Sequence, residues 1–80
     1  MIVAVAIQHR GKTYSLPRPN RHHHVILHIV STTGASHVDG EQGFLDDEGN
    51  FLSRAMAAGH AFACGQIKEE KKGLFSEDVW

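Results

Sequence analysis

Histidine is the residue type best suited to chemistry in this chain, because seven histidines occur among 80 residues. His24 and His28 are four residues apart, so on a helix their rings would share one face and could chelate a divalent ion. His60 and Cys64 repeat that spacing. Neither pair belongs to an HExxH or CxxC pattern, and such pairs arise by chance in a histidine-rich chain. We therefore expect no metal and no cofactor, with a metal site kept as the alternative.

Anion binding is favoured by the residues just before this pair. Arg21, His22 and His23 are expected in the first turn of a helix, where backbone N–H groups are unpaired and the helix dipole is positive. The dipole disfavours cations there, and a bound phosphate would explain their presence. Arg54, at the start of a second expected helix, suits a further phosphate. Two alternatives stay open: solubilising surface residues, or a histidine that hydrogen-bonds the following hairpin.

The patterns of nucleophilic catalysis are absent. No serine lies in a GxSxG context, and Cys64 falls in an apolar helix, where a thiol behaves as a small hydrophobic group. Asp46, Asp47 and Glu48 form an acidic run at an expected hairpin tip, where their usual role is turn formation. We therefore expect a protein that is not an enzyme.

Aromatic side chains could stack on nucleobases if they are exposed. Phe75 and Trp80 lie in the C-terminal segment, whereas most other phenylalanines are expected in the core. Stacking therefore depends on an exposure that the sequence does not show.

Length and charge restrict the class of protein. Eighty residues predict one domain, 1–80, with a single modest core. The formal net charge of −1 gives no electrostatic basis for non-specific binding to nucleic acid or to anionic lipid. One cysteine excludes a disulfide within the chain and fits a reducing compartment. The apolar start MIVAVAI is too short for a membrane span and lacks a signal peptide's basic residues, so we expect a cytoplasmic protein.

Alternating and turn-forming residues predict two hairpins. Residues 2–10 are apolar on both faces, which is typical of a strand covered on two sides, and TYSL, 13–16, is expected to return as its partner. Pro17 and Pro19 close that strand because neither can donate to a sheet. In residues 42–52, QGFL and NFL flank an acidic turn that ends in glycine, which predicts the second hairpin.

Two helices follow these hairpins. Asn20 is the expected N-cap of the first helix, which should end near Gly34. Ser53 is expected to cap the second, with Gly65 near its end. Residues 74–80 are expected to form a short final strand or extended tail. The predicted fold is α+β: a small antiparallel sheet of two hairpins with two helices, in the order β-β-α-β-β-α, with a possible final β.

The second helix predicts self-association. From residue 55 to residue 65 its only non-apolar side chain is His60, and a helix that is apolar all round is usually buried all round. A single sheet covers only one side, so the other is expected to meet another copy of the chain. The alternative is that alanine simply tolerates exposure. We expect a homo-oligomer, a dimer or tetramer, with Ala58, Phe62 and Trp80 at its interface.

Several short motifs resemble a family of small bacteriophage proteins. They are RHH at 21–23, EQGFL at 41–45, FLSRAMA at 51–57, AxGQI at 63–67 and LFSEDVW at 74–80. The resemblance covers residues 20–80, and the hairpin-plus-helix block and the SEDVW ending are its most specific parts. The family carries acidic residues after the arginine of the second helix, whereas this chain has Ala55, Met56 and Ala57, which favours packing over function at that turn.

The resemblance implies a phage anti-defence protein, a sponge that sequesters a cyclic-nucleotide immune signal such as those of CBASS without catalysis. Its small-molecule ligand would lie near subunit contacts, against Arg21, His22, His23, Gln42, Gly43, Phe44 and Arg54. Two alternatives stay open: an inhibitor that binds a host defence or regulatory protein, and a small metal-binding or nucleotide-processing domain.

Overall fold

Strand β1 (Ile2–His9) lies at the centre of the computed structural model, which describes residues 1–80. Side chains on both faces of this strand are buried, as its two-sided apolar pattern predicts. It pairs antiparallel with β2 (Lys12–Pro17) and with β3 (Glu41–Asp46). Strand β4 (Phe51–Ser53) completes a four-stranded antiparallel sheet in the order β2-β1-β3-β4. The α+β class and the order β-β-α-β-β-α are therefore confirmed.

Both hairpin turns follow from local sequence. Arg10 and Gly11 join β1 to β2 with φ values of 51° and 79°, and positive φ at both central residues is typical of a two-residue hairpin turn. In the second turn the Asp46 carboxylate accepts from the backbone N–H of Glu48 and of Asn50 at 3.0 and 2.8 Å. The hydrogen bond from the Asn50 N–H is the largest cause that lowers the pKa of Asp46, and the bond from Glu48 lowers this pKa further. The acidic run therefore forms the turn, as expected.

Helix α1 (His22–Thr33) begins one residue later than a cap at Asn20 would place it. Asn20 instead closes the turn after β2, since its side-chain Nδ2 donates to the Pro17 carbonyl at 2.7 Å. The N-cap is Arg21, whose backbone N–H donates to Nδ1 of His24 at 2.8 Å. The helix ends as predicted at Gly34, which has a φ of 74° and donates its N–H to the Val30 carbonyl.

Helix α2 (Arg54–Ala63) is capped by Ser53, whose side chain accepts from the Met56 N–H at 3.2 Å, as predicted. Its inner face is buried, and Ala58 on that face has no exposed surface. The assignment of Ala58 to an oligomer interface is therefore wrong, because the chain itself covers it. Phe62 is 43% exposed on the outer face. Cys64 follows the helix as an exposed C-cap rather than lying inside it.

The C-terminal segment forms a short helix, α3 (Ser76–Val79), so the prediction of a strand or extended tail is wrong. The Asp78 carboxylate accepts from the Phe75 backbone N–H at 2.9 Å and stabilises this turn. Trp80 is held within the chain, since its indole Nε1 donates to the Asn20 carbonyl at 2.8 Å, and its ring is only partly buried, so its place at an oligomer interface stays a prediction. None of the three helices has the length and apolar composition that crossing a bilayer requires.

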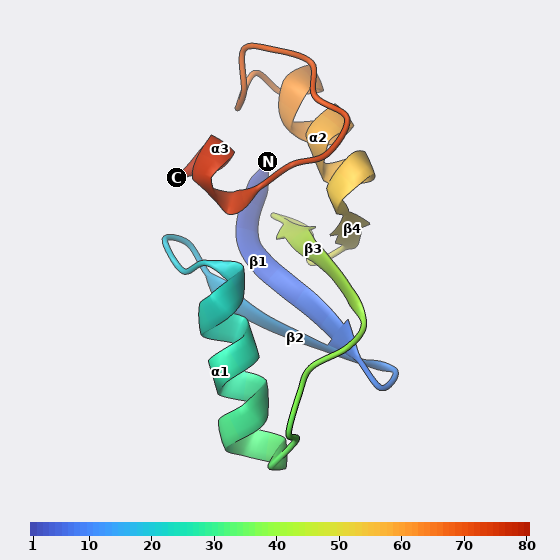
Figure 1. Cartoon of the computed structure of the whole chain (residues 1–80). Helices are drawn as coiled ribbons and strands as arrows, with labels where there is room; N and C mark the ends of the chain where they lie inside the picture. Colours follow the sequence, from blue (N-terminus) through green and yellow to red (C-terminus); the bar gives the residue numbers. More distant parts are fainter.

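The core lies between one face of the sheet and the helices. Register places Val5 opposite Phe44, and both side chains are fully buried. The buried residues of α1 and α2, among them Val25 and Ala57, belong to the same cluster. Helix α1 contacts β1 and β2, whereas α2 contacts mainly β3 and β4, and α3 lies near the other end of the sheet from most of α1 (Figure 1). The first turn of α1 therefore approaches the C-terminal segment.

Phe44→Ala should lower the free energy of unfolding by about 3–5 kcal/mol, because it removes the largest fully buried side chain and leaves a cavity. Leu27, which is 64% exposed on α1, is the matched control, and Leu27→Ala should change stability by no more than about 0.5 kcal/mol. Urea titration followed by circular dichroism measures both. Equal losses in the two variants would contradict the assigned core.

Candidate functional site

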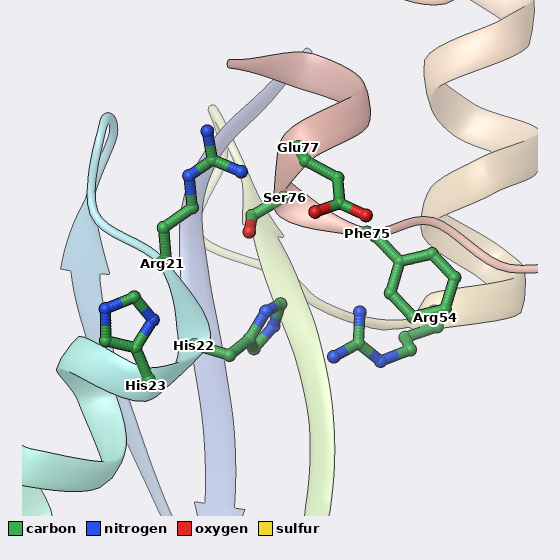
Figure 2. Close-up of a pocket in the computed structure, with 7 residues that line it drawn as sticks. All are labelled: Arg21, His22, His23, Arg54, Phe75, Ser76 and Glu77. Carbon is green, nitrogen blue, oxygen red and sulfur yellow. The ribbon is translucent and has the colours of Figure 1, made fainter.

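A cavity of about 370 Å³ opens where three separate segments meet. The first turn of α1, the start of α2 and the C-terminal segment each supply part of its wall (Figure 2). Its size is near the lower end of the range for ligand pockets, about 300–1,000 Å³. Seven residues line it: Arg21, His22, His23, Arg54, Phe75, Ser76 and Glu77. The structure thus brings together the two arginines and two histidines from which an anion site was predicted.

His22 forms the floor of this cavity. It is 8% exposed, and its ring stands edge-on to Phe44 with 5.0 Å between ring centroids. The Gly43 carbonyl only accepts, so Nε2 carries the proton in their 2.7 Å hydrogen bond. This bond confirms the alternative that a histidine holds the following hairpin. Nδ1 has no partner in the protein and keeps contact with solvent, so it is available to a ligand in the cavity.

The charge of His22 is set by its surroundings. Burial is the largest cause that lowers its pKa, and the positive charge of Arg54 lowers it further. The hydrogen bond to Gly43 acts in the opposite direction but does not outweigh burial. His22 is therefore neutral at pH 7, and its Nδ1 is a hydrogen-bond acceptor.

Arg54 is fixed in place by the protein. Its guanidinium donates to the Leu74 carbonyl at 2.8 Å and to Oε1 of Gln42 at 2.7 Å. The guanidinium carbon lies 4.7 Å from the centroid of the Phe75 ring, within the range of a cation–π contact. Burial lowers the pKa of Arg54, but the ordinary value is so high that the side chain stays charged.

Arg21 differs from Arg54 because its guanidinium has no partner. It takes part in none of the ion pairs or side-chain hydrogen bonds of the chain, and it extends along the cavity beside Ser76 (Figure 2). His23, the second residue of α1, is exposed, and its ring lies against that of His24 with 4.0 Å between ring centroids. The free donors of Arg21 are thus directed to solvent at the rim of the cavity.

Ser76 and Glu77 complete the wall, although neither was predicted from the sequence as a site residue. Ser76 is only 7% exposed, but its hydroxyl has no partner in the protein, keeps contact with solvent and is turned into the cavity (Figure 2). Glu77 is exposed and forms no ion pair. The SEDVW motif was visible in the sequence, but nothing local in it places these side chains against α1. Phe75, considered above for stacking, is 52% exposed at this wall.

Three predicted ligand residues support the pocket instead of lining it. Gln42 holds Arg54, and the Gly43 carbonyl holds His22. Phe44 is fully buried beneath the His22 ring, so a ligand in the cavity cannot reach it. Its assignment as a ligand contact is wrong, because the alternation of the strand turns this side chain into the core.

The two candidate metal pairs have other partners or positions. Nδ1 of His24 accepts from the Arg21 N–H, and the ring of His28 packs against Tyr14. Nε2 of His60 lies 2.7 Å from the N-terminal amine. No three histidine, cysteine or carboxylate side chains gather in a set that could hold a metal ion.

The family model described as phage T4 y16D protein matches residues 1–80. The chain belongs to this family. Neither the curated proteins nor the solved structures include a match. The resemblance to small phage proteins is thereby confirmed, and in this y16D-family chain it extends to the first hairpin.

The lowered pKa of His22 predicts a pH dependence of stability. Below pH 6.5 the unfolded chain protonates this side chain more readily than the folded chain, so stability contributed by neutral His22 is lost as the pH falls. His22→Gln keeps an N–H donor for Gly43 but cannot titrate, so its stability should fall less between pH 7.5 and pH 5. Urea unfolding at several pH values measures the difference. Parallel curves for the two proteins would contradict the environment described for His22.

Proposed function

We propose that the pocket binds the phosphate of a nucleotide and that the protein sequesters this nucleotide, a host signal of the cyclic-nucleotide type, without turning it over. The observation that carries the proposal is the set of polar atoms left without partners around one cavity. The Arg21 guanidinium, the Ser76 hydroxyl and Nδ1 of His22 all belong to this set. His22 and Ser76 are more than nine-tenths buried as residues, but these two polar atoms still reach the solvent of the cavity, so a ligand there can bond to them.

A phosphate satisfies the donors of this set. The guanidinium of Arg21 can form a two-pronged contact with phosphate oxygens, and the Ser76 hydroxyl can donate to a third oxygen. The first turn of α1 adds unpaired backbone N–H groups and a positive dipole end. Arg54 adds a fixed positive charge on the opposite side of the cavity (Figure 2). Attraction to an anion is therefore built from three elements of the fold.

Sequestration rather than turnover is supported by the lack of an activated nucleophile. The Ser76 hydroxyl and the His22 ring face the same cavity, but no hydrogen bond joins them, and a nucleophile needs such contact with its base. Cys64 is exposed at the end of α2 and is not part of the cavity wall. These features favour a binding protein.

Self-association would match the pocket to a larger ligand. About 370 Å³ suits one base–sugar–phosphate unit, so a cyclic dinucleotide would need a pocket from each of two chains. Met56 and Phe62 are 61% and 43% exposed on the outer face of α2, which supports this helix as a contact between copies. We therefore infer a symmetric dimer as the ligand-binding form.

A second candidate function is supported by the same two side chains. An exposed apolar helix face also suits a host protein, and the chain would then act as an inhibitor by binding it. Pull-down from host lysate with wild type and with Phe62→Glu separates the two candidates. Capture of one host protein by wild type alone, together with no nucleotide binding, would favour the inhibitor.

Arg21→Gln should weaken the binding of nucleoside monophosphates and cyclic dinucleotides about tenfold or more, because it removes a charge-assisted contact to phosphate. Isothermal titration calorimetry at low salt measures the dissociation constants. Lys72→Gln is the matched control: it removes the same charge from an exposed site outside the cavity and should leave affinity nearly unchanged.

Two outcomes would contradict this proposal. One is the absence of binding by inorganic phosphate and by every nucleotide tested. The other is the recovery of hydrolysed nucleotide from the mixture, which chromatography of the supernatant would detect and which would indicate an enzyme.

Phe62→Glu should shift the protein from dimer to monomer, because it places a charge on the proposed apolar contact. Light scattering after size-exclusion chromatography gives the mass of each variant. Glu70→Gln, an exposed change outside the helix, serves as the control. A wild-type protein that is monomeric at all concentrations, with and without cyclic dinucleotide, would overturn the proposed dimer.

A further inference from the structure

The acidic side of the pocket is not explained by phosphate binding. Glu77 turns its carboxylate toward the cavity, between Arg21 and Phe75 (Figure 2), and it pairs with neither arginine. A carboxylate close to a phosphate would repel it. Its position therefore favours a ligand that also presents hydrogen-bond donors, at a distance from its own negative charge.

An aromatic surface lies next to this carboxylate. The Phe75 ring is 52% exposed, and the fixed guanidinium of Arg54 covers it at 4.7 Å from the ring centroid. Arg54 is in turn held by Gln42 and by the Leu74 carbonyl, so the guanidinium that lies over the ring is itself fixed. Aromatic rings and guanidinium planes are the surfaces on which proteins stack unpaired nucleobases.

Hydrogen-bonding capacity limits which base fits. An ionised Glu77 only accepts, and neutral His22 presents Nδ1, also an acceptor. Guanine carries two adjacent donors on one edge, its N1–H and its 2-amino group. Adenine and cytosine set an amino donor beside a ring-nitrogen acceptor, and uracil has a single N–H between two carbonyls. Only guanine can give both oxygens of one carboxylate a hydrogen bond.

We propose that the pocket is selective for a guanine nucleotide, whose N1–H and 2-amino group donate to Glu77 while the base lies against Phe75 and Arg21 holds the phosphate. This inference rests on the proposed nucleotide binding and adds the base that is read. In this arrangement Arg21 contacts the phosphate, and Glu77 contacts the base edge.

The test is calorimetry of the full chain with GMP, IMP and AMP. Wild type should bind GMP about tenfold or more tightly than AMP, because one bidentate base contact gives discrimination of this order. IMP keeps the N1–H but lacks the 2-amino group, so its affinity should lie between the two. Cyclic di-GMP and cyclic di-AMP repeat the comparison for two-base ligands.

Glu77→Gln gives opposite expectations for the two purines. The amide loses one acceptor, so GMP should bind about tenfold more weakly, whereas AMP should bind equally or more tightly because a negative charge is removed. Phe75→Leu should weaken GMP and AMP by similar factors, because stacking tolerates any base. Both residues are exposed, so neither variant removes part of the core.

Different results would contradict guanine selectivity and nucleotide binding. Equal affinity for GMP and AMP in wild type, or a Glu77→Gln variant that binds both more tightly, would overturn guanine selectivity and leave phosphate binding in place. If neither the three nucleotides nor inorganic phosphate bind wild type, nucleotide binding and guanine selectivity both fail.

Discussion

The hydrogen bond from His22 to the Gly43 carbonyl ties the first turn of α1 to the centre of the sheet, and the pocket depends on it. Gly43 lies where β4 comes closest: a Cβ there would stand 2.2 Å from the Leu52 carbonyl oxygen. Glycine therefore lets β4 pair at this point, and the chain enters α2 directly after it. One residue thus positions two of the three segments of the pocket, because His22 and Arg54 both take their place from it.

Local signals in the sequence were enough to predict much of this architecture. The acidic turn at Asp46, the cap at Ser53 and the stop at Gly34 each depend on residues within one turn, so short patterns reveal them. The grouping of cations at two helix starts was predicted for the same reason. It became a site only through packing, since Arg21 and Arg54 are far apart in the chain.

The other parts of the site depend on long-range contacts, which the spacing of residues in the sequence does not reveal. Ser76 and Glu77 reach the cavity because Leu74 bonds to Arg54 and Trp80 bonds to Asn20. Each of these bonds uses at least one backbone group, which carries no residue signature. The misplacement of Phe44 has a different cause: alternation along a strand shows that two faces exist but does not show which one meets a helix.

Local charge in this protein differs from its overall charge. The net charge of −1 gives no sign of an anion site, yet two arginines share one small cavity with a histidine that burial keeps neutral. Neutral His22 avoids a third positive charge beside Arg54 and leaves an acceptor at the floor. The cavity therefore combines donors and acceptors instead of presenting a uniform positive field.

The segment that carries Phe75, Ser76 and Glu77 is anchored at both ends. Leu74 is fully buried and bonded to Arg54 through both its N–H and its carbonyl, and Trp80 is tied to Asn20 on the other side of the cavity. These contacts restrain the wall at both of its ends. Little conformational entropy is then lost when a ligand enters, so more of the contact energy is kept as affinity. The same rigidity makes the shape of the cavity a filter, because a ligand of the wrong outline finds no second arrangement of the wall to accept it.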